Sequence, residues 1–209
     1  MYLSIFYFLA LIPILTLHEA AHAFAALKLG DPTAERAGRV SLNPLRHLSL
    51  LGTIMLFLAG FGWGKPVPVN PRNFAHPLRD SALTALAGPM ANLLIAILAA
   101  IFYEYLPDGT ILWAVSNAFL ELSLLLFLFN MLPFPPLDGS KFWILLLPAQ
   151  YRQSVQDFFE KTMPYFVAFV VIDVYFFERA FGFSFIKMFM GCGVFSLRSA
   201  LSLLAQLIV

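Results

Sequence analysis

The first 29 residues, MYLSIFYFLALIPILTLHEAAHAFAALKL (Met1–Leu29), decide the fold class. This run is almost continuously apolar, and it is longer than the roughly 20 residues that a helix needs to cross a bilayer core of about 30 Å. It has no basic N-terminal region and no small-residue cleavage site, so it is not typical of a signal peptide. Three ionisable side chains, His18, Glu19 and His22, lie within its apolar part. The stretch therefore predicts a membrane-spanning helix with polar chemistry inside it.

The composition of the whole chain agrees with this prediction. Of the 209 residues, 60% are hydrophobic and 12% are charged, with a net charge of +1, whereas soluble domains carry about 25% charged residues. These values exclude a soluble enzyme, a disordered chain and a nucleic-acid binder with a basic face. The single cysteine, Cys192, excludes a disulfide framework and a cysteine-based zinc site. What remains is a polytopic membrane protein.

Further apolar runs predict an all-α polytopic membrane protein with five to six transmembrane helices. The run Leu48–Phe61 has 14 residues, which as a helix would reach only about 21 Å. The longer runs are Ser81–Tyr105, Ile111–Leu132, Val155–Phe177 and Phe183–Val209. We expect residues 1–139 to form the catalytic membrane core and residues 140–209 to supply C-terminal helices of the same membrane domain.

The basic residues predict how these spans are oriented in the cell membrane. Seven of the 13 Lys and Arg residues lie between Lys28 and Arg79, whereas the loop Glu104–Thr110 has none. Because basic loops stay in the cytoplasm, Met1 and this loop are expected outside. Both flanks of Leu48–Phe61 are then cytoplasmic, so that segment is expected to be re-entrant or interfacial.

Two stretches between the first spans differ from the apolar runs in length and composition. Gly38–Pro44 and Lys65–Pro71 are short, contain valine and are bounded by glycine and proline, which favours extended segments over helices. Irregular loops remain the alternative. The edge of an extended segment could pair with another extended chain, and the candidate edges are Gly38–Asn43 and Lys65–Asn70.

The sequence His18-Glu19-Ala20-Ala21-His22 is an H-E-x-x-H motif. Residues four apart share one face of a helix, so both imidazoles can reach one metal ion. Zinc suits this geometry and leaves a position open for water, and Glu19 could take the proton of that water. The alternative is a structural polar cluster that faces a neighbouring helix. His47 and His76 lie in basic loops and are expected to have ordinary surface or interfacial roles.

Two histidines need a third protein ligand, and the acidic residues near membrane depth are Glu104, Glu121, Asp138 and Asp173. Asp138 is distinguished by its surroundings, because three prolines precede it and Gly139 follows it. Such a turn at membrane depth is tolerated only when it is buried in protein or lines a cavity. Its predicted depth, at the cytoplasmic end of a span, matches that of the histidines. A helix cap is the alternative role for this carboxylate.

These residues together resemble the site-2 protease family of intramembrane zinc metalloproteases. The resemblance rests on three motifs in the order of that family: H-E-x-x-H at His18–His22, G-x-x-x-N at Gly88–Asn92, and N-x-x-P-x-x-x-L-D-G at Asn130–Gly139. Many members carry a PDZ or CBS domain. Since 209 residues leave no room for one, the chain resembles a small member without accessory domains.

The resemblance implies that His18, His22 and Asp138 hold one Zn²⁺ ion per chain and that Glu19 is the catalytic base. It implies cleavage of transmembrane protein or peptide substrates near the cytoplasmic face of the lipid bilayer. It also implies a short membrane-embedded β element between the first helices. No nucleic-acid partner is expected.

Two asparagines in the motifs have candidate roles of their own. Asn92 could bind a substrate carbonyl or a developing oxyanion, and the alternative is an interhelical hydrogen bond. Asn130 could orient the Asp138 loop or cap its helix. For Glu121, Asp173 and Arg198, a structural ion pair or a water-facing position is expected rather than catalysis. The two C-terminal spans could gate access to the site or hold a homo-oligomer together.

Other functions compete with an intramembrane protease. A protease of the prenyl-protein-processing kind also places H-E-x-x-H in a membrane helix, but its third ligand is a glutamate on a helix, and the Leu137-Asp138-Gly139 context argues against it. A divalent-metal transporter would be expected to show an internal repeat or ligands spread over several helices. A catalytically inactive metal-binding scaffold has no reason to retain Glu19, which is not a ligand.

Overall fold

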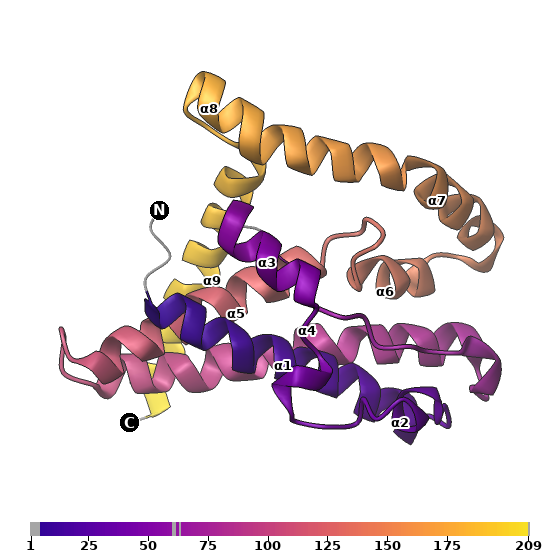
Figure 1. Ribbon diagram of the computed structural model, residues 1–209, viewed down its shortest axis with the longest axis horizontal. Helices are drawn as coiled ribbons and strands as arrows, with labels where there is room; N and C mark the ends of the chain where they lie inside the picture. The colour runs from indigo at the N-terminus through magenta and orange to yellow at the C-terminus, as the bar shows by residue number, and fades with distance from the viewer. Residues whose placement is uncertain (1–4, 60–61, 63, 209) are drawn as a thin grey trace.

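The protein is described here from a computed structural model that covers residues 5–59, 62 and 64–208. The beginning of the predicted first span, the end of the predicted short segment at Gly60–Phe61, and Val209 therefore lie outside the described residues. Figure 1 shows an all-helical arrangement. The helices are α1 (Ile5–Lys28), α2 (Thr33–Arg36), α3 (Leu50–Ala59), α4 (Pro77–Tyr105), α5 (Ile111–Asn130), α6 (Gly139–Leu146), α7 (Ala149–Val171), α8 (Glu178–Phe181) and α9 (Phe185–Ile208).

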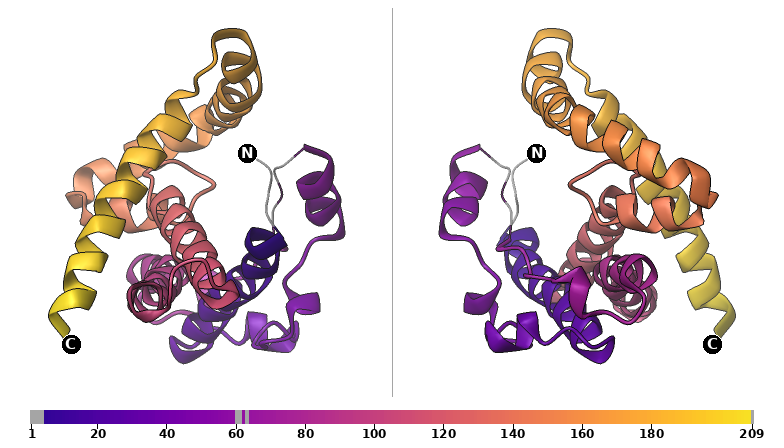
Figure 2. Two further views of the ribbon diagram at one scale, coloured as in Figure 1. Left: turned by 90° about the vertical axis from the view of Figure 1, so that its left-hand side faces the viewer. Right: turned by 90° about the vertical axis from the view of Figure 1, so that its right-hand side faces the viewer.

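Four helices in the described part of the chain are long and apolar enough to cross a membrane: α1, α4, α5 and the Phe185–Gln206 part of α9. They coincide with four of the predicted long runs, and they make the chain a multi-pass membrane protein. The fifth run, Val155–Phe177, is also helical, in α7 and the π-helical turn Ile172–Phe177. It is not among the four spans, because the first half of α7 is rich in Gln, Asp, Glu and Lys. Helix α3 has only 10 residues, and Figure 2 shows it apart from the central helices.

Helices α1, α4 and α5 pack on one another and form the centre of the molecule. Their contact surfaces are built largely from alanine, which lets helix backbones approach closely where lipid supplies no hydrophobic driving force. One buried cluster joins α1 to α5, and the other joins α4 to α5. Their buried members are Ala10, Ile14 and Ala118 in the first, and Ala96, Ala99, Ala100, Leu120 and Leu124 in the second.

Helix α9 packs against α4 and α5, on the side of the core away from α1 (Figure 2). Arg198 of α9 pairs with Glu121 of α5, with 2.5 Å between Nη1 and Oε1. The hydroxyl of Tyr105 on α4 donates to the carbonyl of Ala205 at 3.0 Å. Of the two expected roles for these residues, the structure shows the ion pair, and it joins Glu121 to Arg198.

The expectation of a short β element between the first helices is wrong for the residues that the structure describes. These hold one isolated antiparallel bridge, between Leu48 and Gly64, and no strand. Side chains end the extended backbone early: Asn43 and Asn70 each accept a hydrogen bond from the amide two residues later and so begin a 3-10 turn. Two of the six residues in Lys65–Asn70 are prolines, which cannot donate to a sheet.

Asp31, just after α1, ties these loops together. Its carboxylate is fully buried and accepts hydrogen bonds from the Asn70 amide at 2.7 Å and from the Asn73 side chain at 2.6 Å. Burial raises the pKa of Asp31, but its hydrogen bonds, those from Thr33 first, lower the pKa by more, so the net shift is downward. The end of α1 is thus fixed to the segment that leads into α4.

Candidate active site

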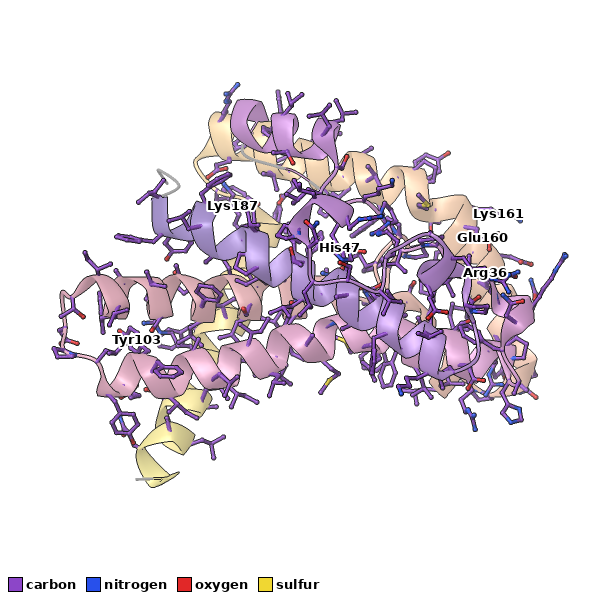
Figure 3. The ribbon with its side chains drawn as sticks, turned by 60° about the horizontal axis from the view of Figure 1, so that its bottom comes forward. Arg36, His47, Tyr103, Glu160, Lys161 and Lys187 are labelled. Atoms are coloured by element: carbon purple, nitrogen blue, oxygen red, sulfur yellow. The ribbon has the colours of Figure 1, made fainter. Side chains whose placement is uncertain are left out.

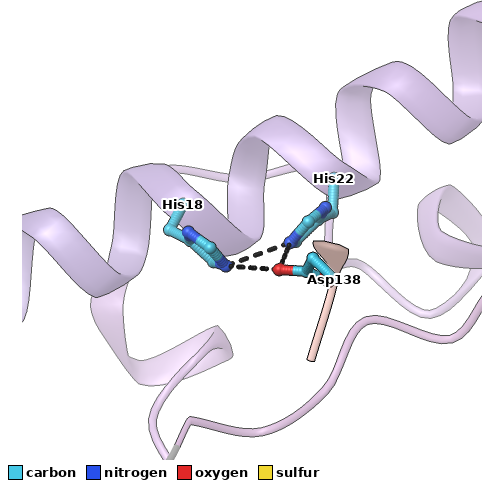
Figure 4. A group of neighbouring side chains, drawn as sticks. All are labelled: His18, His22 and Asp138. Atoms are coloured by element: carbon cyan, nitrogen blue, oxygen red, sulfur yellow. Dashed lines mark hydrogen bonds and ion pairs between the residues drawn. The ribbon is translucent and has the colours of Figure 1, made fainter. Parts of the chain in front are cut away.

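The two histidines of the H-E-x-x-H motif lie on one face of α1, as their spacing predicts (Figure 4). Both side chains are buried, and their Nε2 atoms are 3.1 Å apart. In an apolar helix, buried imidazoles need partners for both ring nitrogens. The pair therefore presents two adjacent nitrogen ligands toward one point.

Asp138 reaches this pair from the turn between α5 and α6. Its Oδ2 lies 3.2 Å from Nε2 of His18 and 3.2 Å from Nε2 of His22 (Figure 4). Four tetrahedral ligands at about 2.0–2.1 Å from zinc lie about 3.3 Å from one another. The three donor atoms, with separations of 3.1–3.2 Å, therefore match one face of a zinc tetrahedron. In the described part of the chain, these three residues are the one group that could hold a metal ion.

Gly139 explains how Asp138 reaches the histidines. A Cβ at this position would lie 2.5 Å from the backbone carbonyl atoms of Met131, which is far inside van der Waals contact. Only glycine allows the start of α6 to approach the end of α5 so closely. The Trp143 indole closes the same turn by donating to the Met131 carbonyl at 2.8 Å. The turn before α6 therefore places the Asp138 carboxylate near the histidines, and a side chain at Gly139 would force this turn away from Met131.

Helix α4 supports the two imidazoles from behind. His22 Nδ1 lies 2.7 Å from the Thr84 carbonyl oxygen, which can only accept, so Nδ1 carries the proton and Nε2 keeps its lone pair. The Asn92 amide lies 3.0 Å from His18 Nδ1. An amide that presents its oxygen there would accept from Nδ1–H in the same way, and it would satisfy Oδ1, which is otherwise buried without a partner among the described groups. Partners of this kind fix the tautomer of metal-binding histidines.

Gly88, midway between Thr84 and Asn92, makes room for the rings. A Cβ at Gly88 would lie 2.3 Å from His22 Nε2 and 2.7 Å from His18 Cε1. The G-x-x-x-N spacing therefore has a physical meaning: the glycine admits the imidazoles, and the asparagine contacts one of them a turn later. The predicted substrate or oxyanion role of Asn92 stays a prediction, because its amide already contacts His18.

Glu19 lies beside the donor triangle without belonging to it. Its side chain is 15% exposed. Oε2 is 3.8 Å from Nη2 of Arg39, and Oε1 faces Gly64, where an added Cβ would lie 3.4 Å away. A carboxylate beside a donor triangle of this kind is placed as a general base for a metal-bound water would be.

Sequence reasoning missed Arg39 and misplaced His47. Arg39 is 3% exposed, and His47 is fully buried next to it, with Nδ1 3.4 Å from Nη2 of Arg39. Figure 3 shows His47 beside the middle of α1, whereas Arg36 lies toward the end of the molecule. No signal in the sequence separates Arg39 from the exposed arginines of the same basic loop. Burial lowers the pKa of Arg39, and the charge of Glu19 opposes that shift.

Asn130 ends α5, and its amide donates to the Leu126 carbonyl at 2.9 Å. This contact is the helix-capping alternative for Asn130. Its role in orienting the Asp138 loop stays a prediction. The site therefore draws its side chains from α1, α4, the turn before α6 and the loop after α2.

Comparisons with known proteins show similarity to one family of proteases. The family model of Peptidase family M50 matches residues 109–173, which include Asp138. A candidate zinc metalloprotease of Bacillus subtilis (strain 168), YwhC, is 41% identical over 156 residues, which cover 70% of this chain and 71% of YwhC. A candidate zinc metalloprotease of Mycobacterium tuberculosis, Rip2, is 38% identical over 133 residues, which cover 60% of this chain and 51% of Rip2.

The chain thus spans about half the length of the Rip2 proteins that it matches. No solved structure matches the chain. The similarity to YwhC extends over most of both chains, and the family match falls on the part that carries Asp138. The chain therefore belongs to Peptidase family M50, the site-2 protease family of membrane zinc metalloproteases.

Proposed function

We propose that this protein is an intramembrane zinc endopeptidase that hydrolyses peptide bonds in or near transmembrane segments, close to the cytoplasmic face. The observation that carries the proposal is the triangle of His18, His22 and Asp138 donors, with the two histidines and Glu19 on a helix that is long and apolar enough to span the membrane. A zinc ion held there would lower the pKa of its bound water and polarise the scissile carbonyl. One ion per chain is expected from one donor triangle.

Glu19 is the residue that moves the proton. Its carboxylate accepts a proton from the attacking water and later donates it to the leaving amine, so it is regenerated in each turnover. Asn92 and Thr84 hold the imidazoles in place during this exchange. Because Glu19 is not a ligand, its removal should separate proton transfer from metal binding.

A substrate helix must unwind before its peptide bond can be attacked, and its backbone then needs new partners. The segment Lys65–Asn70 supports such pairing. Residues that precede proline favour extended backbone, and the amides of Val67 and Val69 have no hydrogen-bond partner within the described chain. The other candidate edge, Gly38–Asn43, begins in a turn at Gly38 and bends at Val40 and Ser41, so it is less suited to pairing.

An apolar groove supports access from the lipid. It is lined by Leu11, Ile12 and Leu15 of α1 and by Leu48 and Thr53 on the side of α3. Leu15 lies one helical turn before Glu19, and Leu48 follows the buried His47. A transmembrane substrate whose side chains enter this groove would have its cytoplasmic end near the base.

The cytoplasmic placement is supported by charge. The connection between α1 and α4 carries most of the basic residues near the site, and such loops remain in the cytoplasm. The basic residues of this connection that lie outside the membrane spans are Arg36, Arg39, Arg46, Lys65 and Arg72.

The test uses the purified full chain with a reporter substrate whose single transmembrane segment carries Gly, Asn or Leu beside the scissile bond. Wild type should cut the Gly and Asn segments faster than the Leu segment. Glu19→Gln should keep its zinc and lose activity by at least about 100-fold, as expected for loss of a general base. Zinc binding without any cleavage would favour the alternative of a non-proteolytic metal-binding protein. Equal cleavage of the Leu segment would contradict the unwinding step.

A further inference from the structure

Arg39 is a buried cation in a loop whose other arginines face outward. Its side chain is 4% exposed, whereas Arg36 and Arg46 of the same loop are exposed. Burying a guanidinium is costly unless it is paired and hydrogen-bonded. The position of Arg39 therefore needs an explanation that the positive charge of a cytoplasmic loop does not supply.

The contacts of Arg39 converge on the region beside the base. Nη1 donates to the Pro66 carbonyl at 2.9 Å, and Nη2 donates to the Lys65 carbonyl at 2.5 Å. Nη2 also lies 3.8 Å from Oε2 of Glu19. The guanidinium thus joins the backbone just after Gly64 to the Glu19 carboxylate.

The carbonyls alone do not explain a charged residue, because any neutral donor could satisfy them. The guanidinium is also imperfectly satisfied, since Nε is buried with no partner among the described groups. What the charge adds is attraction to Glu19, the one acidic side chain paired with Arg39 in the described chain. A cation that is partly unsatisfied and close to a reactive carboxylate points to a role in the site rather than in stability.

We propose that Arg39 is a positioning residue, which holds the Glu19 carboxylate against the Gly64–Pro66 backbone and beside the metal ligands. This inference rests on the proposed function of Glu19 as the base. Oε2 of Glu19 lies 3.8 Å from Nη2 of Arg39, and Oε1 is directed toward Gly64, where a Cβ added to the glycine would lie 3.4 Å from it. The ion pair with Arg39 therefore favours one place of the carboxylate from which to accept a proton.

In the described part of the chain, Arg39 makes no hydrogen bond or ion pair with His18, His22 or Asp138. Zinc binding should therefore be independent of Arg39, while turnover should depend on it. The positive charge, and not only the hydrogen bonds to carbonyls, should be the property that matters.

The experiment compares Arg39→Gln with Arg39→Lys in the purified full chain, on one reporter substrate with a Gly-containing transmembrane segment. Both replacements can donate to a carbonyl, but only lysine is charged. Arg36→Gln is the matched control, because it removes an exposed arginine three residues away. Zinc content, melting temperature, kcat and KM are measured for each protein.

We expect Arg39→Gln to keep wild-type zinc content and to lose kcat by at least about tenfold, with KM changed by less than about threefold. Arg39→Lys should recover kcat to within about threefold of wild type. Arg36→Gln should match wild type. Equal kcat values for the Gln and Lys variants would overturn the proposal, because the charge would then not matter. Loss of zinc or of the folded state in Arg39→Gln would also overturn it, because Arg39 would then be a structural residue.

Failure of the proposed function gives a different result. In that case wild type does not cleave the substrate, or Glu19→Gln cleaves it as fast as wild type. A failure confined to Arg39 leaves the wild-type activity and its loss in Glu19→Gln unchanged.

Discussion

Ionisable side chains lie at membrane depth both around His18 and along α9, but they are arranged differently. Around His18, three donor atoms from two distant parts of the chain face one point, at separations of 3.1–3.2 Å. Along α9, Arg198 and Glu121 face each other, and the Tyr7 hydroxyl also donates to Glu121. The first group holds lone pairs toward a shared centre, whereas the second neutralises its own charges.

This difference separates a site from a structural cluster. Polar groups inside a membrane are costly in either case, so each group needs either a partner or a functional role. A closed pair of opposite charges needs no further ligand, whereas a converging set of acceptors needs a cation. Variants in the two regions should therefore affect different measurements.

The largest effect is expected from Asp138→Ala. Removing one of three ligands should lower zinc content from about one ion per chain to background and abolish cleavage. Metal analysis of the purified protein measures this effect. Asp108→Ala is the control, because Asp108 is exposed in the loop before α5. Full zinc occupancy in Asp138→Ala would remove this residue from the ligand set.

Gly88→Ala should come next. Its methyl group would lie 2.3 Å from His22 Nε2, so the ring or the helix must move, and zinc binding should weaken strongly. Gly191→Ala makes the same change on α9, where nothing lies within 4 Å of the added carbon. Zinc titration of the two variants should show a loss for Gly88 only. A Gly88→Ala protein with wild-type affinity would mean that the helices separate without cost.

Asn92 tests the support of His18 more finely. Asn92→Leu should weaken zinc binding by about 10–100-fold, as is usual when the partner of a metal-bound histidine is lost. Asn92→Asp keeps an acceptor for Nδ1–H and should retain most of the affinity. If both variants bind zinc normally but turn over slowly, Asn92 acts on the substrate or oxyanion instead.

The smallest effect on the site is expected from the α9 region. Glu121→Gln should destabilise the protein by about 1–2 kcal/mol, which is typical of interhelical polar contacts in membranes, and leave zinc content and kcat unchanged. Thermal unfolding and metal analysis measure the two effects. The Glu121→Gln/Arg198→Gln double variant, which removes both charges, should lose less stability than the single variant, because no charge at membrane depth is left unpaired. A fall in zinc content would show that α9 and the site are coupled.

Several features of the site could be predicted from short stretches of sequence. The apolar run around H-E-x-x-H predicts a membrane helix, and a helix places residues i and i+4 on one face whatever surrounds it. Prolines followed by Asp138 and Gly139 predict a turn that presents a carboxylate. These signals are local, so the structure agrees with them.

The β element shows where local reading fails. Valines bounded by glycine and proline favour extended backbone, but a strand also needs a partner with free donors and acceptors. Here the side chains of Asn43 and Asn70 begin turns, and Arg39 takes the carbonyls of Lys65 and Pro66. The hydrogen bonds of a sheet were replaced by side-chain bonds from distant residues, which no pattern within the segment records.

The sequence by itself determined the membrane class, the helix that carries His18, Glu19 and His22, and the turn that carries Asp138. Only the tertiary structure decided that Gly88 and Asn92 of α4 lie against the imidazoles and that Arg39 is buried beside Glu19 while Arg36 is not. The reason is physical: spacing along one helix fixes which residues share a face, but which face meets another helix, and which charge is taken out of water, depends on packing between segments that are far apart in the chain.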